Sequence, residues 1–160
     1  MKVVCNSSTL IALARIGHLD ILEKEVKSLL IPRAVYEEVV VKGMDKPGAV
    51  EIREAKWIEE RDVHNRELVM GFNTVLDLGE SEAIVLAKEI NADLLILDDE
   101  EARKKALSEG IRVAGLLAIL IQAKKRGTIK KVKPFLEALK DNGFFIREEL
   151  YYQTIQEAEE

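Results

Sequence analysis

Acidic and amide side chains recur in this chain where an apolar run has just ended or within the helical segment that follows one. They are Asn6, Glu37, Glu38, Glu80, Glu82, Asp98 and Asp99. Carboxylate and amide oxygens are the ligands that hard divalent cations accept in proteins. Carboxylates that lie close together repel one another unless a cation joins them. The pattern therefore predicts one site for Mg²⁺ or Mn²⁺, assembled from distant parts of the chain.

Such a site supports the hydrolysis of phosphate esters. A bound divalent ion polarises a phosphoryl oxygen, lowers the pKa of an attacking water and neutralises charge that develops on a phosphodiester. Each acid also has a structural explanation when it is taken alone. The acids at 98–101 would open a helix, where they cap free N–H groups and complement the helix dipole. The metal hypothesis therefore depends on whether the acids meet in space.

The elements that must position these residues alternate along the chain. Short apolar runs predict strands at 2–5, 28–31, 57–58, 94–97 and 112–114. The segments with helical character are 9–15, 18–24, 32–43, 49–55, 62–70, 80–90, 98–110, 115–126, 131–140 and 147–160. This alternation is typical of an α/β protein with a mostly parallel sheet, in which ligands bind beyond the carboxyl ends of the strands. Asn6 and Asp98 each follow directly on a predicted strand.

Helix geometry favours Glu80 over Glu82 for the site. Glu80 shares one helix face with apolar residues three, four and seven positions later, so its carboxylate is directed toward the sheet. Glu82 lies about 200° around the helix and points elsewhere, although apolar residues on its own side keep it as a candidate. The same reasoning does not separate Glu37 from Glu38, because apolar residues surround both.

Composition restricts the class of protein. The 160 residues, 48% of them hydrophobic, predict one domain over 1–160 that ends in an acidic helical tail from about 147 to 160. One cysteine and two histidines exclude an intramolecular disulfide and a classical zinc site. The longest apolar run, 116–121, is too short to cross a membrane. No secretion signal is apparent, so a soluble cytoplasmic protein is expected.

Positive charge is concentrated in one segment although the whole chain has a net charge of −5. Between 103 and 133, ten basic residues stand against the single acid Glu109, which gives this segment a net charge of +9. Such a segment can form a basic surface beside an acidic site. The residues expected to steer a nucleic acid are Arg103, Lys104, Arg112, Lys124, Lys125 and Arg126. The alternative is that these side chains belong to ordinary solvated helix faces.

Four motifs, in order, make the sequence resemble the PIN-domain family, in particular its toxin-like prokaryotic and archaeal nucleases of toxin–antitoxin modules. The motifs are VCNSSTLIAL at 4–13, IPRAVYEEV at 31–39, LGESEAI at 78–84 and LLILDD at 94–99. The resemblance implies a three-layer α/β/α sandwich on a mostly parallel sheet of four to five strands. It also implies cleavage of single-stranded RNA that depends on Mg²⁺ or Mn²⁺, a homodimer, and a small antitoxin protein as partner.

The resemblance also implies the site residues. The family's acidic positions fall on Asn6, Glu38, Glu80 and Asp98, with Ser8 as the companion hydroxyl and Asp99 as an additional ligand. Asn6 departs from the family pattern, which has aspartate there. An amide oxygen can bind a metal but brings no negative charge, so metal affinity should be weaker unless Glu82 or Asp99 compensates. The alternative function is a catalytically impaired module that binds RNA or a protein.

Overall fold

The computed structural model describes residues 1–160 and is built around one five-stranded sheet. The strands are β1 (Val3–Cys5), β2 (Leu29–Pro32), β3 (Ile58–Arg61), β4 (Leu94–Ile96) and β5 (Val113–Ala114). Their order across the sheet is β3-β2-β1-β4-β5, and every neighbouring pair is parallel. The predicted parallel sheet is therefore confirmed, with five strands.

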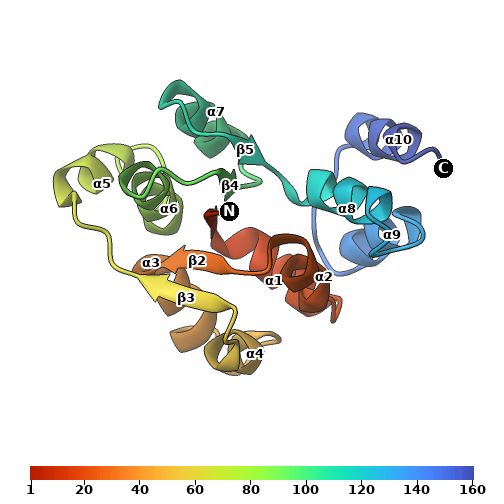
Figure 1. Cartoon of the computed structure of the whole chain (residues 1–160), viewed down its shortest axis with the longest axis horizontal. Coiled ribbons are helices and arrows are strands. Elements are labelled where there is room, and N and C mark those ends of the chain that lie inside the picture. Colours follow the sequence, from red (N-terminus) through yellow and green to blue (C-terminus); the bar gives the residue numbers. More distant parts are fainter.

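Helices cover both faces of the sheet, as Figure 1 shows. Their bounds are α1 (Ser7–Arg15), α2 (Leu19–Val26), α3 (Arg33–Tyr36), α4 (Ala49–Glu54), α5 (Arg66–Phe72), α6 (Leu78–Glu89), α7 (Glu100–Ser108), α8 (Leu116–Lys125), α9 (Lys133–Asp141) and α10 (Glu148–Glu157), with a π-helix η1 (Glu37–Val41) after α3. The predicted α/β/α sandwich is confirmed. No helix is long and apolar enough to cross a membrane.

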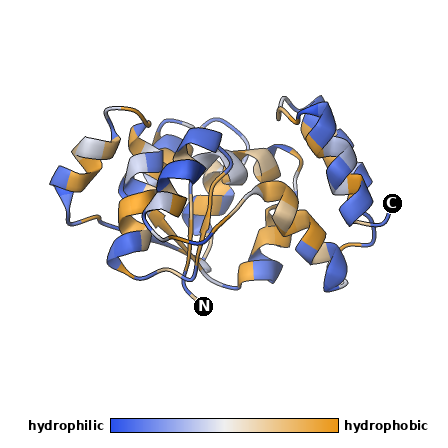
Figure 2. Ribbon diagram, turned by 90° about the horizontal axis from the view of Figure 1, so that it is seen from above, coloured by the Kyte–Doolittle hydropathy of each residue, from blue (hydrophilic) through white to orange (hydrophobic).

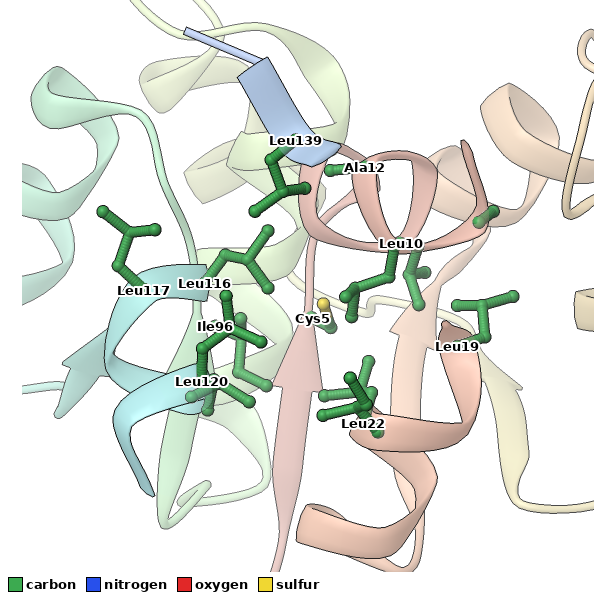
Figure 3. Close-up of a cluster of buried hydrophobic side chains, with 14 of the residues drawn as sticks. Cys5, Leu10, Ala12, Leu19, Leu22, Ile96, Leu116, Leu117, Leu120 and Leu139 are labelled. Carbon is green, nitrogen blue, oxygen red and sulfur yellow. The ribbon is translucent and has the colours of Figure 1, made fainter. Parts of the chain in front are cut away.

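Alternation along β1 divides the buried side chains into two cores. Val3 and Cys5 point into a cluster of 29 buried residues shared with α1, α2 and α8, while Val4 points into a cluster of 15 shared with α5, α6 and α7. Figure 3 shows Cys5 between Leu10 of α1 and Ile96 of β4. Because β1 is buried on both faces, Asn6 immediately after it is held firmly.

The strand order reverses direction at β1, which pairs with β2 on one side and with β4 on the other. In open α/β sheets this switch point leaves a crevice beyond the strand ends. The backbone N–H of Asn6 donates to the Ile96 carbonyl at 3.2 Å, so the residues that leave β1 and β4 stay together. The fold thus brings Asn6 and Asp98 to the same edge of the sheet, as the sequence predicts.

The segment after β2 differs from the single predicted helix. Pro32, expected in a first helical turn, is the last residue of β2 and the extended cap of α3, with φ −74° and ψ 163°. After Tyr36 the helix widens, and the Lys42 N–H reaches the Glu37 carbonyl five residues back at 2.8 Å. Such π-helical turns are often found at functional sites because they change the direction of side chains.

The C-terminal helices form the wall beside the switch point. In Figure 1 α8, α9 and α10 lie at one side of the molecule, at the cyan and blue end of the colour scale. Figure 2 shows α8 as predominantly hydrophobic and α10 as predominantly hydrophilic. Glu160 holds the end of the chain in place, because its carboxylate accepts from the N–H groups of Val132 and Lys133 and from Lys124.

Candidate active site

Two adjoining cavities open at the carboxyl edge of the sheet. The inner cavity, of about 300 Å³, is lined by Asn6, Glu38 and Glu80. The outer cavity, of about 510 Å³, is lined by Asp98, Asp99 and Glu80. Ser8, Glu80 and Phe144 line both, so the two cavities form one continuous cleft. The acidic and amide residues of four separate stretches of the sequence therefore line one cleft.

Asp98 is the most firmly positioned acid of the cleft. Its Oδ2 accepts from the buried Thr9 hydroxyl at 2.6 Å, and its Oδ1 accepts from the Leu116 N–H at 2.8 Å. A side chain at position 115 would obstruct this arrangement, because a Cβ on Gly115 would lie 2.8 Å from Asp98 Oδ1. Each carboxylate oxygen keeps a free lone pair for another ligand. Asp98 is thus fixed between α1 and the start of α8 while it still faces the cleft.

Asn6 lies at the floor of the inner cavity and is 4% exposed. Its Oδ1 accepts from the Ser8 hydroxyl at 3.2 Å. In this arrangement the amide oxygen is turned toward Ser8, which lines both cavities, and it can act as a neutral ligand. The predicted companionship of Asn6 and Ser8 is therefore present as a direct hydrogen bond.

The structure separates Glu37 from Glu38. Glu38 lines the inner cavity, and its Oε2 accepts from the buried Ser7 hydroxyl at 2.7 Å. Glu37 instead pairs on the surface with Arg33 of the preceding helix α3, at 3.4 Å. Ser7 begins α1 directly after Asn6, so the hydrogen bond ties the π-helix to the centre of the site.

Glu80 lies where the two cavities meet, in the first turn of α6. Burial, and then the negative charges of Asp77 and Asp99, raise the pKa of Glu80 from 4.5 to about 7. The carboxyl group of Glu80 therefore lies in the negative field of Asp77 and Asp99. Asp77 caps α6 by accepting from the Glu80 N–H at 2.7 Å.

We expect Glu80 to make the metal-free protein less stable as pH rises. Between pH 4.5 and about 7 the folded state keeps a proton on Glu80 that the unfolded chain has lost, so the free energy of unfolding falls over this range. Glu80→Gln should remove that slope and stabilise the protein at pH 8 by on the order of 1 kcal/mol, after allowance for solvent screening. Urea unfolding in EDTA at pH 5 and pH 8 measures the free energy of unfolding of both proteins. The same change in this free energy between the two pH values for the natural protein and for Glu80→Gln would contradict the raised pKa of Glu80.

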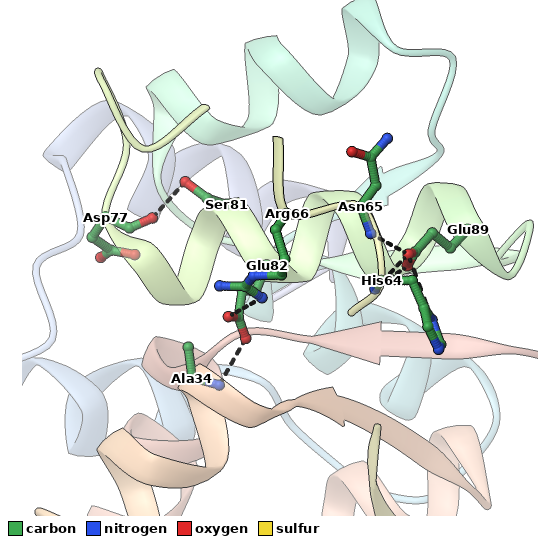
Figure 4. A network of polar contacts seen from close by, with 8 residues as sticks. All are labelled: Ala34, His64, Asn65, Arg66, Asp77, Ser81, Glu82 and Glu89. Atoms are coloured by element: carbon green, nitrogen blue, oxygen red, sulfur yellow. Dashed lines mark hydrogen bonds and ion pairs between the residues drawn. The ribbon is translucent and has the colours of Figure 1, made fainter. Parts of the chain in front are cut away.

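Glu82 does not line the cleft, although sequence analysis keeps it as a supporting residue. Its side chain is 5% exposed, and its two oxygens are bound to the Ala34 N–H at 2.9 Å and to Arg66 at 2.8 Å. Figure 4 shows these contacts on the side of α6 that faces α3. Glu82 thus satisfies the N-terminus of α3 and holds α3, α5 and α6 together.

Glu82→Ala should destabilise the fold without changing metal affinity. The change leaves the Ala34 N–H without its acceptor and removes the ion pair with Arg66, whose side chain is exposed, so the cost is about 1–3 kcal/mol and comes mainly from the unsatisfied N–H. Glu82→Gln keeps an acceptor for Ala34 and should lose roughly half as much. Chemical denaturation measures the loss of stability, and Mn²⁺ titration of the folded variants measures their metal affinity. A large drop in Mn²⁺ affinity for Glu82→Gln would show that Glu82 supports the site after all.

Comparison with known proteins agrees with this architecture. The family model described as "DUF3368: PIN domain" matches residues 2–160. The chain belongs to the PIN-domain family. Among solved structures, a PilT N-terminus domain protein, SSO1118, from the archaeon Sulfolobus solfataricus P2 superposes with a TM-score of 0.53 at 23% identity, covering 77% of this chain and 93% of that one. No curated protein sequence matches the chain. PIN domains are generally nucleases and usually use divalent metal ions.

The donors of this PIN domain suit a hard divalent cation by their chemistry. The cleft offers carboxylate, amide and hydroxyl oxygens, and the negative charges of Asp77 and Asp99 around Glu80 produce a repulsion that a cation relieves. No three His, Cys, Asp or Glu side chains lie close enough together in this structure to hold a metal ion. Binding of an ion would therefore need rotation of flexible side chains such as Glu80 toward the fixed Asp98.

Sequence reasoning missed Asp77, which lines the inner cavity of the PIN domain and adds to its negative charge. The signal was present in the spacing of Asp77 and Glu80, because an acid three residues before a glutamate is typical of a helix N-terminus. Figure 4 shows Asp77 at this end of α6, where its carbonyl accepts from Ser81.

The six basic residues predicted to steer a nucleic acid do not form one surface around the cleft. Arg103 lines the outer cavity. Lys124 binds Glu160, Arg126 lies 3.7 Å from Glu25, and Lys104 lies 3.9 Å from Glu100. Arg112 lines another cavity together with Arg126, and Lys125 is exposed on α8. Of the six, Arg103 alone lines the cleft of the PIN domain.

Proposed function

We propose that this PIN domain is a metal-dependent endoribonuclease that hydrolyses phosphodiester bonds in single-stranded RNA. One observation carries the proposal: Glu38, Glu80 and Asp98 come from distant parts of the chain and line one continuous cleft at the switch point of the sheet. Such crevices are where α/β proteins bind their ligands. The family supplies the reaction class, and the acidic lining supports a metal-dependent form of it.

Each residue of the cleft has a role in this proposal. Asp98, held by Thr9 and Leu116, would be the fixed ligand of a Mg²⁺ or Mn²⁺ ion, and Glu80 and Glu38 would complete the acidic set. Asp99 lines the outer cavity and is placed to be an additional ligand. The bound ion would polarise the scissile phosphate and stabilise the charge that develops on it. Asn6 and Ser8 would orient a water or a phosphate oxygen through their amide and hydroxyl groups.

Hydrolysis by the purified protein tests the proposal. Labelled single-stranded RNA should be cut in the presence of Mn²⁺ and left intact after addition of EDTA, and duplex RNA of the same sequence should be cut more slowly. Single-stranded DNA serves as a second substrate, because it distinguishes a ribonuclease from a general nuclease. Absence of cleavage with Mg²⁺ and with Mn²⁺, by protein shown to be folded, would contradict the proposal.

A second candidate function rests on Asn6. The residue occupies the position directly after the central strand, and its amide contributes no charge to the site. A PIN domain weakened in this way could bind RNA or a partner protein without cutting. Here Asn6→Asp should create a metal affinity that the natural protein lacks, whereas equal Mn²⁺ affinity of the two proteins would count against this candidate.

We extend the first candidate to a biological role as the toxin of a toxin–antitoxin module, acting as a homodimer with a small antitoxin as partner. The family resemblance supports this extension. Induced expression should stop growth of a bacterial host, and Asp98→Asn should allow growth at the same protein level. Equal growth of both cultures would contradict the toxin role and leave the ribonuclease proposal to its own test.

A further inference from the structure

A third cavity extends the cleft beyond Glu38. It has a volume of about 570 Å³ and shares Ile11, Arg15, Glu38 and Asn142 with the inner cavity. The outer cavity, the inner cavity and this third one therefore form a single path across the acidic site. Arg15, Lys42 and Lys46 line the third cavity, which we call the basic cavity.

These three cations come from different segments and are free to bind a ligand. Arg15 ends α1, Lys42 follows the π-helix, and Lys46 lies in the loop before α4. All three side chains are exposed, and none lies within 4.0 Å of an acidic group. By contrast, Lys124 and Arg126 of the basic segment are held by acids. The basic cavity thus has cations without acidic partners, whereas Lys124 and Arg126 of the predicted steering residues are paired with acids.

The π-helix places an acid and a cation on the same cavity wall. Glu38 and Lys42 are four residues apart on one helical face, and both line the basic cavity. The chain then leaves the helix at Gly43, where a Cβ would lie 2.7 Å from the Val39 carbonyl oxygen. Glycine at this position lets the loop turn closely enough for Lys46 to face the same cavity.

The opposite end of the path has a different character. Phe144 lines both the inner and the outer cavity, and Phe145 lines the outer cavity together with Arg103. Phe145 is 83% exposed, the largest fraction among the exposed large hydrophobic side chains of the chain. An exposed aromatic ring in a cavity that an arginine also lines combines the two features with which single-strand binding proteins hold a strand, base stacking and positive charge.

We propose that a single strand of nucleic acid lies along this path, with backbone phosphates on Arg15, Lys42 and Lys46 and a base stacked on Phe145. The proposal rests on the proposed function, because it places the strand across the acidic centre. It names residues outside the basic segment 103–133 as the main phosphate contacts. A strand bound in this way presents one phosphate to Asp98 and Glu80, between the two ends of the path.

The phosphate end is tested by charge removal. The variant R15Q/K42Q/K46Q is compared with K130Q/K131Q/K133Q, which removes the same charge from exposed lysines outside the three cavities. Binding of a fluorescent 12-nucleotide RNA is measured by anisotropy in EDTA, where hydrolysis is suspended. The first variant should bind about tenfold to a hundredfold more weakly near 0.1 M salt and show a shallower salt dependence, since each lost phosphate contact lowers that slope by roughly 0.7. The control should change by less than about threefold.

The base end is tested with Phe145→Ala, and Tyr152→Ala is the matched control. Tyr152 is 62% exposed on α10 but lines none of the three cavities. Phe145→Ala should weaken RNA binding by about tenfold, the effect of one lost stacking contact. It should have no effect on binding of an abasic strand of the same length. Equal losses for the two aromatic variants would overturn the stacking assignment.

The outcomes separate this proposal from the proposed function. If R15Q/K42Q/K46Q binds RNA in EDTA as tightly as the wild-type protein does, the proposed path is wrong and the ribonuclease proposal still stands. A wild-type protein that binds no RNA and cuts none would overturn both. Binding that depends on the three cations in a protein that never cuts would support the path and favour the impaired RNA-binding module.

Discussion

Asp98→Asn is expected to abolish metal-dependent RNA hydrolysis, with a loss of at least about a hundredfold. The variant should still fold, because asparagine can keep both contacts: its oxygen can accept from the Leu116 N–H while its NH₂ group donates to the Thr9 hydroxyl. What it loses is the charge of the most firmly positioned acid of the cleft. The loss is therefore expected in catalysis and in metal affinity, and the melting temperature should change little.

Cleavage assays with Mn²⁺, run beside calorimetric Mn²⁺ titration, measure both effects. Asp20→Asn is the control, since Asp20 is an exposed carboxylate on α2 that pairs with Lys24 and His18 outside the cleft. It should cut RNA at the natural rate. Cleavage that survives Asp98→Asn at full rate would identify a contaminating nuclease, and the assignment of Asp98 would then be wrong.

Asn6→Asp is expected to strengthen Mn²⁺ binding by on the order of ten- to a hundredfold, because a full negative charge joins the ligand set at short range in a partly buried site. RNA hydrolysis should rise with it. In EDTA the same variant should be less stable by about 1–3 kcal/mol, since position 6 is 4% exposed and the new carboxylate has acidic neighbours. Addition of Mn²⁺ should restore that stability.

The combination of lower metal-free stability and higher metal-bound stability is specific to a residue that faces the ion. Asn65→Asp is the control, because Asn65 caps α5 outside the cleft and an aspartate can keep its hydrogen bond from the Leu68 N–H. This control should show no change in Mn²⁺ affinity. Unchanged Mn²⁺ affinity in Asn6→Asp would mean that position 6 does not touch the ion.

Much of the site was predictable because it depends on local rules. Asn6 and Asp98 follow buried parallel strands, so their meeting at one sheet edge follows from topology. Helix periodicity favoured Glu80 and left Glu82 as a candidate, whereas in the structure Glu80 lines the cleft and Glu82 binds Arg66. Glu37 and Glu38 could not be separated from the residues alone, because a regular helix does not predict the wider π-turn that directs Glu38 to Ser7.

The sheet and its helices follow from hydrophobic periodicity, and the departures occur where tertiary contacts compete with local preference. The strand predicted at 57–58 extends to Arg61 because parallel pairing with β2 continues through Pro32. Pro32 ends β2 instead of beginning a helix, since its missing N–H is tolerated at a strand end as well as in a first helical turn.

The distribution of basic residues along the sequence did not predict where unpaired positive charge lies in the folded protein. The segment 103–133 is strongly basic, yet two of its side chains are held by Glu25 and Glu160, residues far away in the sequence. The cations of the basic cavity, in contrast, are single residues from unrelated segments of the chain, so no run of charges marks them. Only the fold brings Arg15, Lys42 and Lys46 together.

The location of a bound ion tests the central claim most directly. Crystals soaked in Mn²⁺ and measured at the manganese absorption edge should show an anomalous peak in the cleft, with Asp98 and Glu80 as ligands and the Asn6 amide oxygen beside it. Glu80 should have turned away from Asp77 to reach the ion. A cleft without such a peak, in a protein whose RNA hydrolysis requires Mn²⁺, would show that the catalytic metal lies elsewhere.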